Sequence, residues 1–317
     1  MYFRGYRFGL CPLFLWKERE EKMTKILETI GKTPLVQLQS IGDGQIYVKV
    51  EKTNPAGSIK DRPAYQMIQA ALEDGSLKKG MTILEPTSGN MGIALALIGK
   101  NLGFDVVLVM PGSMSIERRK LMEAYGAKIV LTGEGGMQAA SDKAKELFAQ
   151  GGYFMPGQFD NPENVRAHEL HTGPEIYEEL KDIKGFVAGI GTGGTVTGVG
   201  HYLKKQDPSI QIWGLEPAES PLLSQGKAGG HQIQGIGANF VPSILDQDVL
   251  DKVTTVKGED AIQMARRLAR EEGLFVGISS GANVVAALDL QKQVGGPVVT
   301  VLPDTGERYL STALVEE

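Results

Sequence analysis

The sequence predicts an α/β fold of two domains, each built on a parallel-rich twisted sheet that is covered by helices. Two observations carry this prediction: short apolar runs alternate with longer segments whose apolar residues recur at helical spacing, and residues 160–162 divide two sets of such units. Repeated strand–helix units form parallel sheets through right-handed crossovers, and short apolar strands suit sheets buried on both faces. We therefore expect a ligand site in the cleft between the two domains.

The same pattern predicts the individual elements. Strands are expected at residues 45–50, 82–84, 106–110, 128–131, 186–190, 210–215 and 297–302. Helices are expected at 91–102, 116–125, 137–148, 260–272 and 282–293. Three more are expected with one bound left open: one that begins at Ala64, one that follows Gln158 and ends at Leu180, and one that follows the strand 186–190 and ends at Leu203. The glycine-rich stretch 220–242 is expected to be a loose loop.

The expected domains follow from this order of elements. Residues 23–52 and 161–317 would form a larger domain, and residues 53–160 a smaller, mobile one. Residues 1–22 are an extension that we expect to be disordered. Its short apolar run is interrupted by Pro12 and lacks a small-residue cleavage site, so a signal peptide fits poorly, and Met23 is an alternative translation start.

Composition excludes several classes of protein. The 317 residues carry a net charge of -5, which disfavours a nucleic-acid partner, and no apolar run is long enough to span a membrane. The single cysteine, Cys11, lies outside the body of the fold, which fits a cytoplasmic protein without disulfides. The histidines lack ligand spacing, so we expect packed or surface histidines and no metal site; they are His168, His171, His201 and His231.

Lys60 is the first candidate for chemistry. It follows the turn Asn54-Pro55-Ala56-Gly57 and precedes a helix, so it sits at a helix start. A lysine amine can form a Schiff base with a carbonyl compound when its surroundings lower its pKa. A solvated lysine at a helix start is the alternative.

A glycine-rich turn between an expected strand and helix, Gly189-Ile190-Gly191-Thr192-Gly193-Gly194-Thr195, offers backbone N–H groups to an anion. It lacks the Lys-Ser/Thr of a nucleotide triphosphate loop. The spacing of its glycines, with Glu216 one unit later, also satisfies a dinucleotide fingerprint. A cup for one phosphate fits the string equally well.

Two further turns lie at expected helix starts. Glu85-Pro86-Thr87-Ser88-Gly89-Asn90-Met91-Gly92 offers hydroxyls, an amide and N–H groups that suit a small carboxylate; a plain N-cap by Thr87 or Ser88 is the alternative. In Gly277-Ile278-Ser279-Ser280-Gly281, a serine could cap the last long helix or donate to a ligand nitrogen.

Together these segments resemble the fold-type II pyridoxal-phosphate (PLP) enzymes, whose fold is like that of the tryptophan synthase β subunit, and among them the cysteine synthases (O-acetylserine sulfhydrylases). The resemblance runs from Ile30-Gly31-Lys32-Thr33-Pro34-Leu35 to Gly306-Glu307-Arg308-Tyr309-Leu310-Ser311-Thr312. It also includes Met114-Ser115-Ile116-Glu117-Arg118-Arg119-Lys120, Thr172-Gly173-Pro174-Glu175-Ile176 and Gln234-Gly235-Ile236-Gly237-Ala238.

The resemblance implies roles for individual residues. Lys60 would hold PLP as a Schiff base and act as the catalytic base. The cofactor phosphate would bind Gly191, Thr192, Gly193, Gly194 and Thr195, the ring hydroxyl would bind Asn90, and the ring nitrogen would face Ser279. The substrate would bind Thr87, Ser88, Gly89, Asn90, Met91, Gln158 and Gly235.

The implied reaction is β-replacement: O-acetyl-L-serine loses acetate to give an α-aminoacrylate, and sulfide adds to form L-cysteine. One residue departs from the family's Thr-Ser-Gly-Asn-Thr-Gly loop, because Met91 replaces its second threonine. That methionine occurs in β-cyanoalanine synthases, so this activity stays open, as does a cystathionine β-synthase reaction. A dinucleotide-dependent dehydrogenase is the alternative from another class, and it leaves Lys60 without a role.

The resemblance also implies partners. A homodimer is expected, and the C-terminal tail of serine acetyltransferase is a possible ligand of the active-site cleft.

Overall fold

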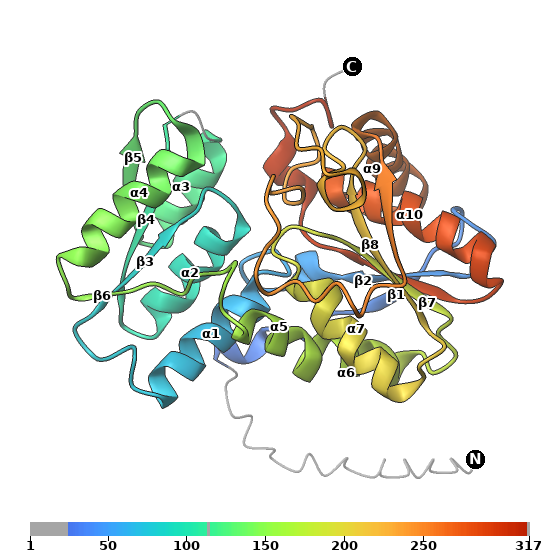
Figure 1. The fold of residues 1–317 in the computed structure, drawn as a ribbon, viewed down its shortest axis with the longest axis horizontal. Helices are drawn as coiled ribbons and strands as arrows, with labels where there is room; N and C mark the ends of the chain where they lie inside the picture. The colour runs from blue at the N-terminus through green and yellow to red at the C-terminus, as the bar shows by residue number, and fades with distance from the viewer. Residues whose placement is uncertain (1–24, 113–114, 316–317) are drawn as a thin grey trace, which may run out of the picture.

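The computed structural model describes residues 25–112 and 115–315, and the predicted extension at residues 1–22 lies outside these ranges. The chain forms two α/β lobes that lie side by side (Figure 1). One contains a six-stranded sheet in the order β1-β2-β10-β7-β8-β9, and the other a four-stranded sheet in the order β5-β4-β3-β6. The predicted α/β architecture with two parallel-rich sheets is confirmed. The domain bounds stay a prediction.

The strands of the larger sheet come from both ends of the described chain. They are β1 (Leu35–Gln37), β2 (Ile46–Val50), β7 (Gly185–Gly189), β8 (Gln211–Pro217), β9 (Lys252–Val256) and β10 (Val298–Leu302). All neighbouring pairs are parallel except β1 and β2, which run antiparallel. The smaller sheet is wholly parallel and contains β3 (Thr82–Pro86), β4 (Asp105–Pro111), β5 (Lys128–Thr132) and β6 (Tyr153–Phe154).

Helices cover both faces of each sheet. Around the smaller sheet lie α1 (Asp61–Glu73), α2 (Asn90–Asn101), α3 (Ile116–Ala124) and α4 (Gly136–Ala149). The larger lobe contains α5 (Glu163–Ala167), η3 (His168–Thr172, a π-helical turn), α6 (Gly173–Glu179), α7 (Gly194–Gln206), α8 (Leu222–Gln225), α9 (Gly258–Glu272) and α10 (Ile278–Val294). Short 3-10 turns are η1 (Ile26–Thr29), η2 (Glu51–Thr53) and η4 (Gly306–Tyr309).

Alternation along the strands explains how one sheet supports two helical layers. In β7, Val187 packs with α9 and α10, whereas its neighbours Phe186 and Ala188 pack with α6 and α7. The smaller sheet repeats this arrangement: Ile83 faces α1 and α2, and Leu84 faces α4. Successive strand side chains point to opposite faces, so wholly apolar strands are buried on both.

Several elements differ from the sequence prediction. The strands β1, β6 and β9 were not expected; β9 is a partly exposed edge strand of only five residues, Lys-Val-Thr-Thr-Val, and gives no buried apolar run. Helix α10 begins at Ile278, four residues earlier than expected, which places Ser279 and Ser280 inside its first turn. The expected helix between 158 and 180 consists of two short α-helices, α5 and α6, joined by the π-helical turn η3.

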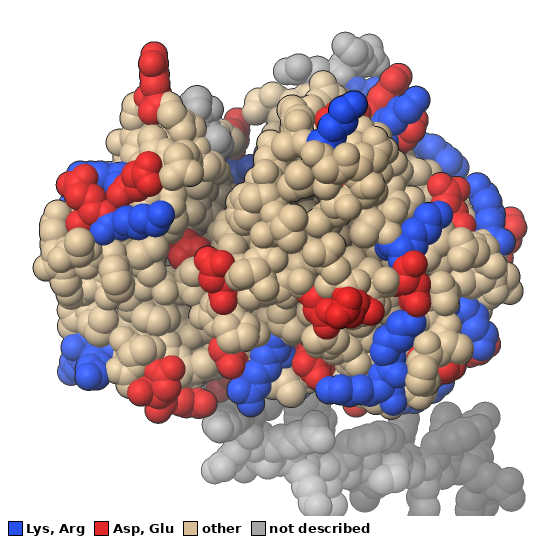
Figure 2. Space-filling model, viewed as in Figure 1, with Lys and Arg blue, Asp and Glu red and all other residues tan. Residues whose placement is uncertain are grey.

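Acidic and basic side chains are interspersed on the face shown in Figure 2, which is hollowed between the two lobes. Among the described residues, no helix is both long and apolar enough to cross a membrane.

Candidate functional site

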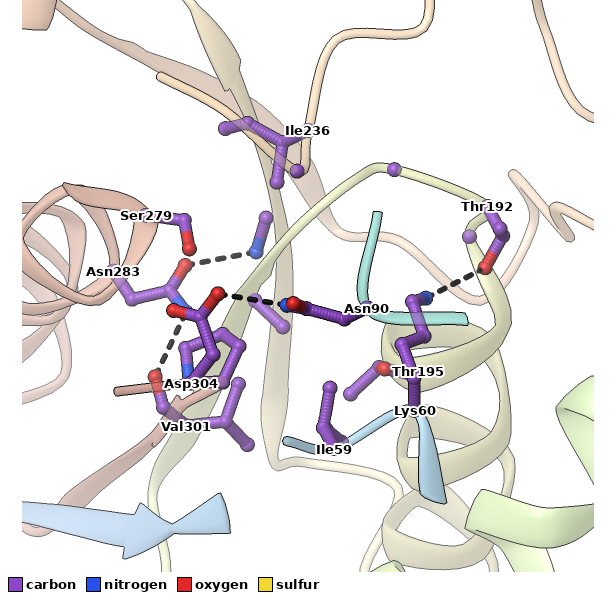
Figure 3. A pocket seen from close by; sticks show the side chains of 16 residues that line it. Ile59, Lys60, Asn90, Thr192, Thr195, Ile236, Ser279, Asn283, Val301 and Asp304 are labelled. Atoms are coloured by element: carbon purple, nitrogen blue, oxygen red, sulfur yellow. Dashed lines mark hydrogen bonds between the residues drawn. The ribbon is translucent and has the colours of Figure 1, made fainter. Parts of the chain in front are cut away.

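Lys60 lies at the centre of a pocket formed where the two lobes meet (Figure 3). It is the N-cap residue of α1, and its Nζ donates to the Thr192 hydroxyl at 3.5 Å. Burial lowers the pKa of Lys60 from 10.5 to about 8. The solvated-lysine alternative is therefore wrong, since this amine is sequestered and easier to deprotonate than a surface lysine.

The backbone around Lys60 is fixed on both sides. Ile59 N–H donates to the Pro303 carbonyl at 2.8 Å, and Ala56 N–H donates to the Asp61 carboxylate at 2.6 Å. Asp61 is buried, and burial raises its pKa to about 7. In the first turn of α1, Arg62 forms ion pairs with Glu51 at 2.8 Å and Glu175 at 2.7 Å. These contacts keep the Lys60 side chain aimed into the pocket.

The glycine-rich turn runs from the end of β7 into α7 and lines the same pocket. Gly193 has φ +83°, a conformation that favours glycine, and a Cβ on Gly191 would collide with the Gly235 carbonyl. A Cβ on Gly194 would collide with the Asn164 side chain. The turn therefore requires glycine, and it presents backbone N–H groups beside the start of a 13-residue helix, which is suited to a phosphate.

Two side chains behind this turn fix its threonine hydroxyls. Asn164 Nδ2 donates to Thr192 Oγ1 at 3.1 Å, and His168 Nε2 lies 3.3 Å from Thr195 Oγ1. The other ring nitrogen of His168 lies 2.9 Å from Thr172 Oγ1. Burial holds the pKa of His168 well below its usual value, so the ring is neutral. The prediction of a packed histidine is confirmed, but its contact with the glycine-rich turn was missed.

Ser279 lines the pocket from the first turn of α10. Nearby, the side-chain Oδ1 of Asn283 accepts from Gly189 N–H at 2.9 Å, and its Nδ2 donates to the Val301 backbone carbonyl at 2.8 Å. Asn283 thereby ties α10 to two neighbouring strands, β7 and β10, at their carboxyl ends. The hydroxyl of Ser279 is left facing the pocket.

Asn90 reaches the pocket from α2 in the smaller lobe, and its amide is held from both sides (Figure 3). Its Nδ2 donates to Asp304 Oδ2 at 2.7 Å, while the Arg308 guanidinium donates to its Oδ1. The Tyr309 hydroxyl also donates to Asp304, at 2.7 Å. Sequence reasoning missed Asp304 and Arg308; their position directly after β10, at the carboxyl edge of a parallel sheet, was the available signal.

The expected carboxylate loop lies next to this pocket but does not line it, apart from Asn90. Gly89 N–H donates to the Thr87 hydroxyl at 3.3 Å, and α2 has no side-chain N-cap, so the plain-cap alternative is wrong. Ser88 is partly exposed, and its hydroxyl lies 3.8 Å from the Met137 sulfur. Met91 is only 1% exposed and belongs to the core of the smaller lobe, so its thioether points away from the pocket.

Gln158 is held beside the carboxylate loop through its backbone. Gly157 and Gln158 donate their N–H groups to the two oxygens of Glu85, at 3.0 and 3.2 Å. The Gln158 carbonyl accepts from Asn164 at 2.8 Å. Glu85 is 2% exposed, and burial raises its pKa to about 7.

Gly235 lines the pocket with φ +96°, and its carbonyl occupies the space that a Cβ on Gly191 would need. Glu216, the acid of the dinucleotide alternative, is buried, and its carboxylate accepts from Leu223 and Ser224 N–H groups at 2.8 and 2.9 Å. Its oxygens cap α8, so they are not offered to a ribose. Among the described residues, no group of three or more His, Cys, Asp or Glu side chains could hold a metal ion.

The chain is similar to known enzymes over most of its length. It is 49% identical over 303 residues to a cysteine synthase of Staphylococcus aureus, covering 93% of this chain and 98% of that protein. It superposes on cysteine synthase from Entamoeba histolytica with a TM-score of 0.90 at 39% identity, over 98% of this chain and 94% of the other. O-ureido-L-serine synthase gives a TM-score of 0.90 at 44% identity, over 93% and 96% of the chains.

A family profile described as pyridoxal-phosphate-dependent enzyme matches residues 26–304. The match includes every candidate site residue named above apart from Arg308 and Tyr309, and the cofactor of this family is the one that the resemblance implied. The chain therefore belongs to the family of pyridoxal-phosphate-dependent enzymes.

Proposed function

We propose that this enzyme is a cysteine synthase, which converts O-acetyl-L-serine and sulfide into L-cysteine and acetate. The Cβ–O bond to acetate breaks, a Cβ–S bond forms, and the proton removed from Cα is returned to it. One observation carries the proposal: a buried lysine with a lowered pKa faces a glycine-lined phosphate cup in a chain that is 49% identical to a curated cysteine synthase.

The residues of the pocket fit PLP. We propose that Lys60 binds the cofactor's aldehyde carbon, Gly191 to Thr195 bind its phosphate, Asn90 binds its ring hydroxyl and Ser279 faces its ring nitrogen. The glycines whose Cβ atoms would collide with Gly235 and Asn164 keep the cup open to an anion. When bound, PLP withdraws electrons from the substrate Cα, which acidifies its proton.

Lys60 is the proton carrier in this proposal. With substrate bound, the free Lys60 amine would remove the Cα proton as a general base and later return it to Cα. Burial supports this role because it lowers the pKa of Lys60 to about 8, close to the operating pH. The neighbouring Thr192 hydroxyl, 3.5 Å away, can orient the free amine.

The uncharged side chain of Ser279 favours elimination. A serine hydroxyl can hydrogen-bond the ring nitrogen but, unlike a carboxylate, does not stabilise a proton on it. The ring is then a weaker electron sink, which limits side reactions such as transamination and suits loss of a leaving group from Cβ.

The substrate carboxylate has donors in the smaller lobe. We propose that it binds Thr87, Ser88, Gly89, Asn90, Met91 and Gln158, and that Gly235 of the larger lobe contacts the substrate from the other side of the pocket. Met91 would contribute only its backbone N–H, since its side chain lies in the core. This burial removes the main reason to prefer cyanide over sulfide as the nucleophile. Because most of the loop does not line the cofactor pocket, we propose that the smaller domain, residues 53–160, closes over the substrate.

An absorbance and product assay tests this function. Purified protein with bound PLP is mixed with O-acetylserine, and cysteine and acetate are measured with and without sulfide. The cofactor band is expected to change on adding O-acetylserine and to return on adding sulfide, with one cysteine formed per acetate. Lys60→Ala should abolish both turnover and the band of bound cofactor. Full activity in that variant would contradict the mechanism, and preference for cyanide or homocysteine would indicate a β-cyanoalanine or cystathionine synthase.

We also propose a cytoplasmic homodimer that binds the C-terminal tail of serine acetyltransferase in its cleft. These proposals rest on the family resemblance alone. Light scattering of the purified enzyme tests the homodimer, and a monomer would contradict it. Steady-state inhibition by the tail peptide at varied O-acetylserine tests the second proposal, and a peptide that does not compete with O-acetylserine would contradict it.

A further inference from the structure

A second cavity, of about 570 Å³, lies behind the cofactor pocket. Its wall is formed by residues 52–57, which lead into the Lys60 turn, by α3 of the smaller lobe and by residues 305–308. It shares no lining residue with the cofactor pocket. Its volume is within the range of sites for small organic molecules.

Two arginines, Arg118 and Arg308, line this cavity, and neither forms an ion pair with a carboxylate of the described chain. Within the described part of the chain, the Arg118 guanidinium makes no hydrogen bond or ion pair; it stacks on the Tyr309 ring at 5.3 Å, and its Nε is buried without a partner. Arg308 is 7% exposed, and its Nε is likewise buried and unpartnered. A buried donor without an acceptor is destabilising, so each Nε favours a ligand that can accept from it.

The remaining donors of Arg308 are occupied on the side away from the cavity. Its guanidinium donates to the Asn90 amide oxygen and to the Ala56 carbonyl. Gly57, with φ +79°, makes room for it, because a Cβ there would lie 2.7 Å from Nη2. Burial lowers the pKa of Arg308, and the charge of Arg118 lowers it further, against the opposing effects of Asp304, Tyr309 and Asp61. The two arginines thus line one cavity and the positive charge of Arg118 is felt at Arg308.

The carboxylates of the cavity lie at its rim. Hydrogen bonding to Ser115 lowers the pKa of Glu117, and the charge of Arg118 lowers it a little further. Glu117 and Glu307 are exposed at its rim, where Glu117 accepts from the Ser115 hydroxyl and Glu307 from the Thr305 hydroxyl. In the described chain, neither forms an ion pair within 4 Å of an arginine. The third cation of the wall, Lys52, donates to the Phe275 carbonyl at 3.1 Å and adds to the positive charge.

We propose that this cavity is a binding site for a small oxyanion, a molecule with a carboxylate, sulfate or phosphate group held between Arg118 and Arg308. An oxyanion would give each unpartnered Nε an acceptor and offset the positive charge of the two guanidinium groups. Guanidinium groups suit this ligand class because their planar forks match the geometry of oxyanions. The site does not depend on the reaction proposed above.

Calorimetric titration with sulfate tests the site, using PLP-loaded protein at constant ionic strength so that the phosphate cup is occupied. Arg118→Met is the test variant, because Arg308 also holds Asn90. Arg119→Met is the matched control, since this neighbouring arginine does not line the cavity. We expect the Kd for sulfate to rise at least tenfold in Arg118→Met and to stay unchanged in Arg119→Met.

Two further measurements guard against misfolding and binding elsewhere. Arg118→Lys keeps the charge but loses the fork, so an intermediate Kd is expected. Crystals grown with selenate should show an anomalous selenium peak between Arg118 and Arg308. Equal sulfate binding by wild type and Arg118→Met, or a selenate peak confined to the cofactor pocket, would overturn the proposal.

Discussion

The rate at which Lys60 binds PLP should depend on pH in a way that reveals how far burial lowers the pKa of its amine. If its pKa is about 8, roughly a tenth of the amine is neutral at pH 7 and about nine tenths at pH 9. Only the neutral amine attacks an aldehyde, so the rate of PLP binding should rise about tenfold across this interval and then level off. For a lysine of ordinary pKa, the neutral fraction rises about 100-fold over the same range without a plateau.

Stopped-flow absorbance measures this rate directly. Protein stripped of its cofactor is mixed with excess PLP from pH 6.5 to 9.5, and Nα-acetyl-lysine serves as the control amine, so that the titration of free PLP can be divided out. Thr192→Val should keep the midpoint near pH 8, because burial lowers the pKa of Lys60 and the Thr192 hydroxyl does not contribute to the shift. A rate that follows the control amine up to pH 9.5 would refute the burial argument.

Three substitutions test the supporting structure. Glu85→Gln should raise KM for O-acetylserine tenfold or more with little change in kcat, because glutamine offers only one acceptor oxygen to the two N–H groups through which Glu85 holds the Gln158 segment. An equal fall in kcat in steady-state kinetics would contradict this. Met91→Thr should lower the free energy of unfolding in urea by about 2–4 kcal/mol, because it puts a shorter, polar side chain into a buried position. The ratio of cyanide to sulfide turnover should not change; a changed ratio would give Met91 a role in specificity. Arg62→Met should lower the free energy of unfolding in urea by about 3–5 kcal/mol, because it leaves the buried Glu51 carboxylate without its cation. A smaller decrease would show that water or another cation compensates.

Much of the fold could be predicted because buried strands and amphipathic helices leave regular patterns. The strand expected at 186–190 and β7 (Gly185–Gly189) differ by one residue at each end. The edge strand β9 could not be found this way, because its threonines and half-exposed side chains resemble a loop. The start of α10 was placed too late because Ser279, Ser280 and Gly281 have low helix propensity, and tertiary packing overrides it: Gly281 lies against Ala261 of α9.

The candidate site was predictable where a short motif carries its own chemistry, as in Lys60 and the glycine-rich turn. It was not predictable where function depends on contacts between distant segments. Asp304 and Arg308 meet Asn90 across more than 200 residues of sequence, and no local pattern marks such a pair. Met91 is a position that the sequence left open between a specificity residue and a tolerated change that uses only the backbone N–H, and the first turn of α2 directs its side chain into the core.

Asn164 links the two halves of the site in a way that bears on how they act together. Its amide donates both to the Gln158 carbonyl in the substrate loop and to the Thr192 hydroxyl in the phosphate cup, and Thr192 in turn accepts from Lys60. Glu85 holds the same Gln158 segment from the smaller sheet. A movement of the smaller lobe therefore reaches the environment of the Lys60 amine through three side chains, all of them buried. Closure of the smaller domain, as proposed above, would therefore change the surroundings of the Lys60 amine.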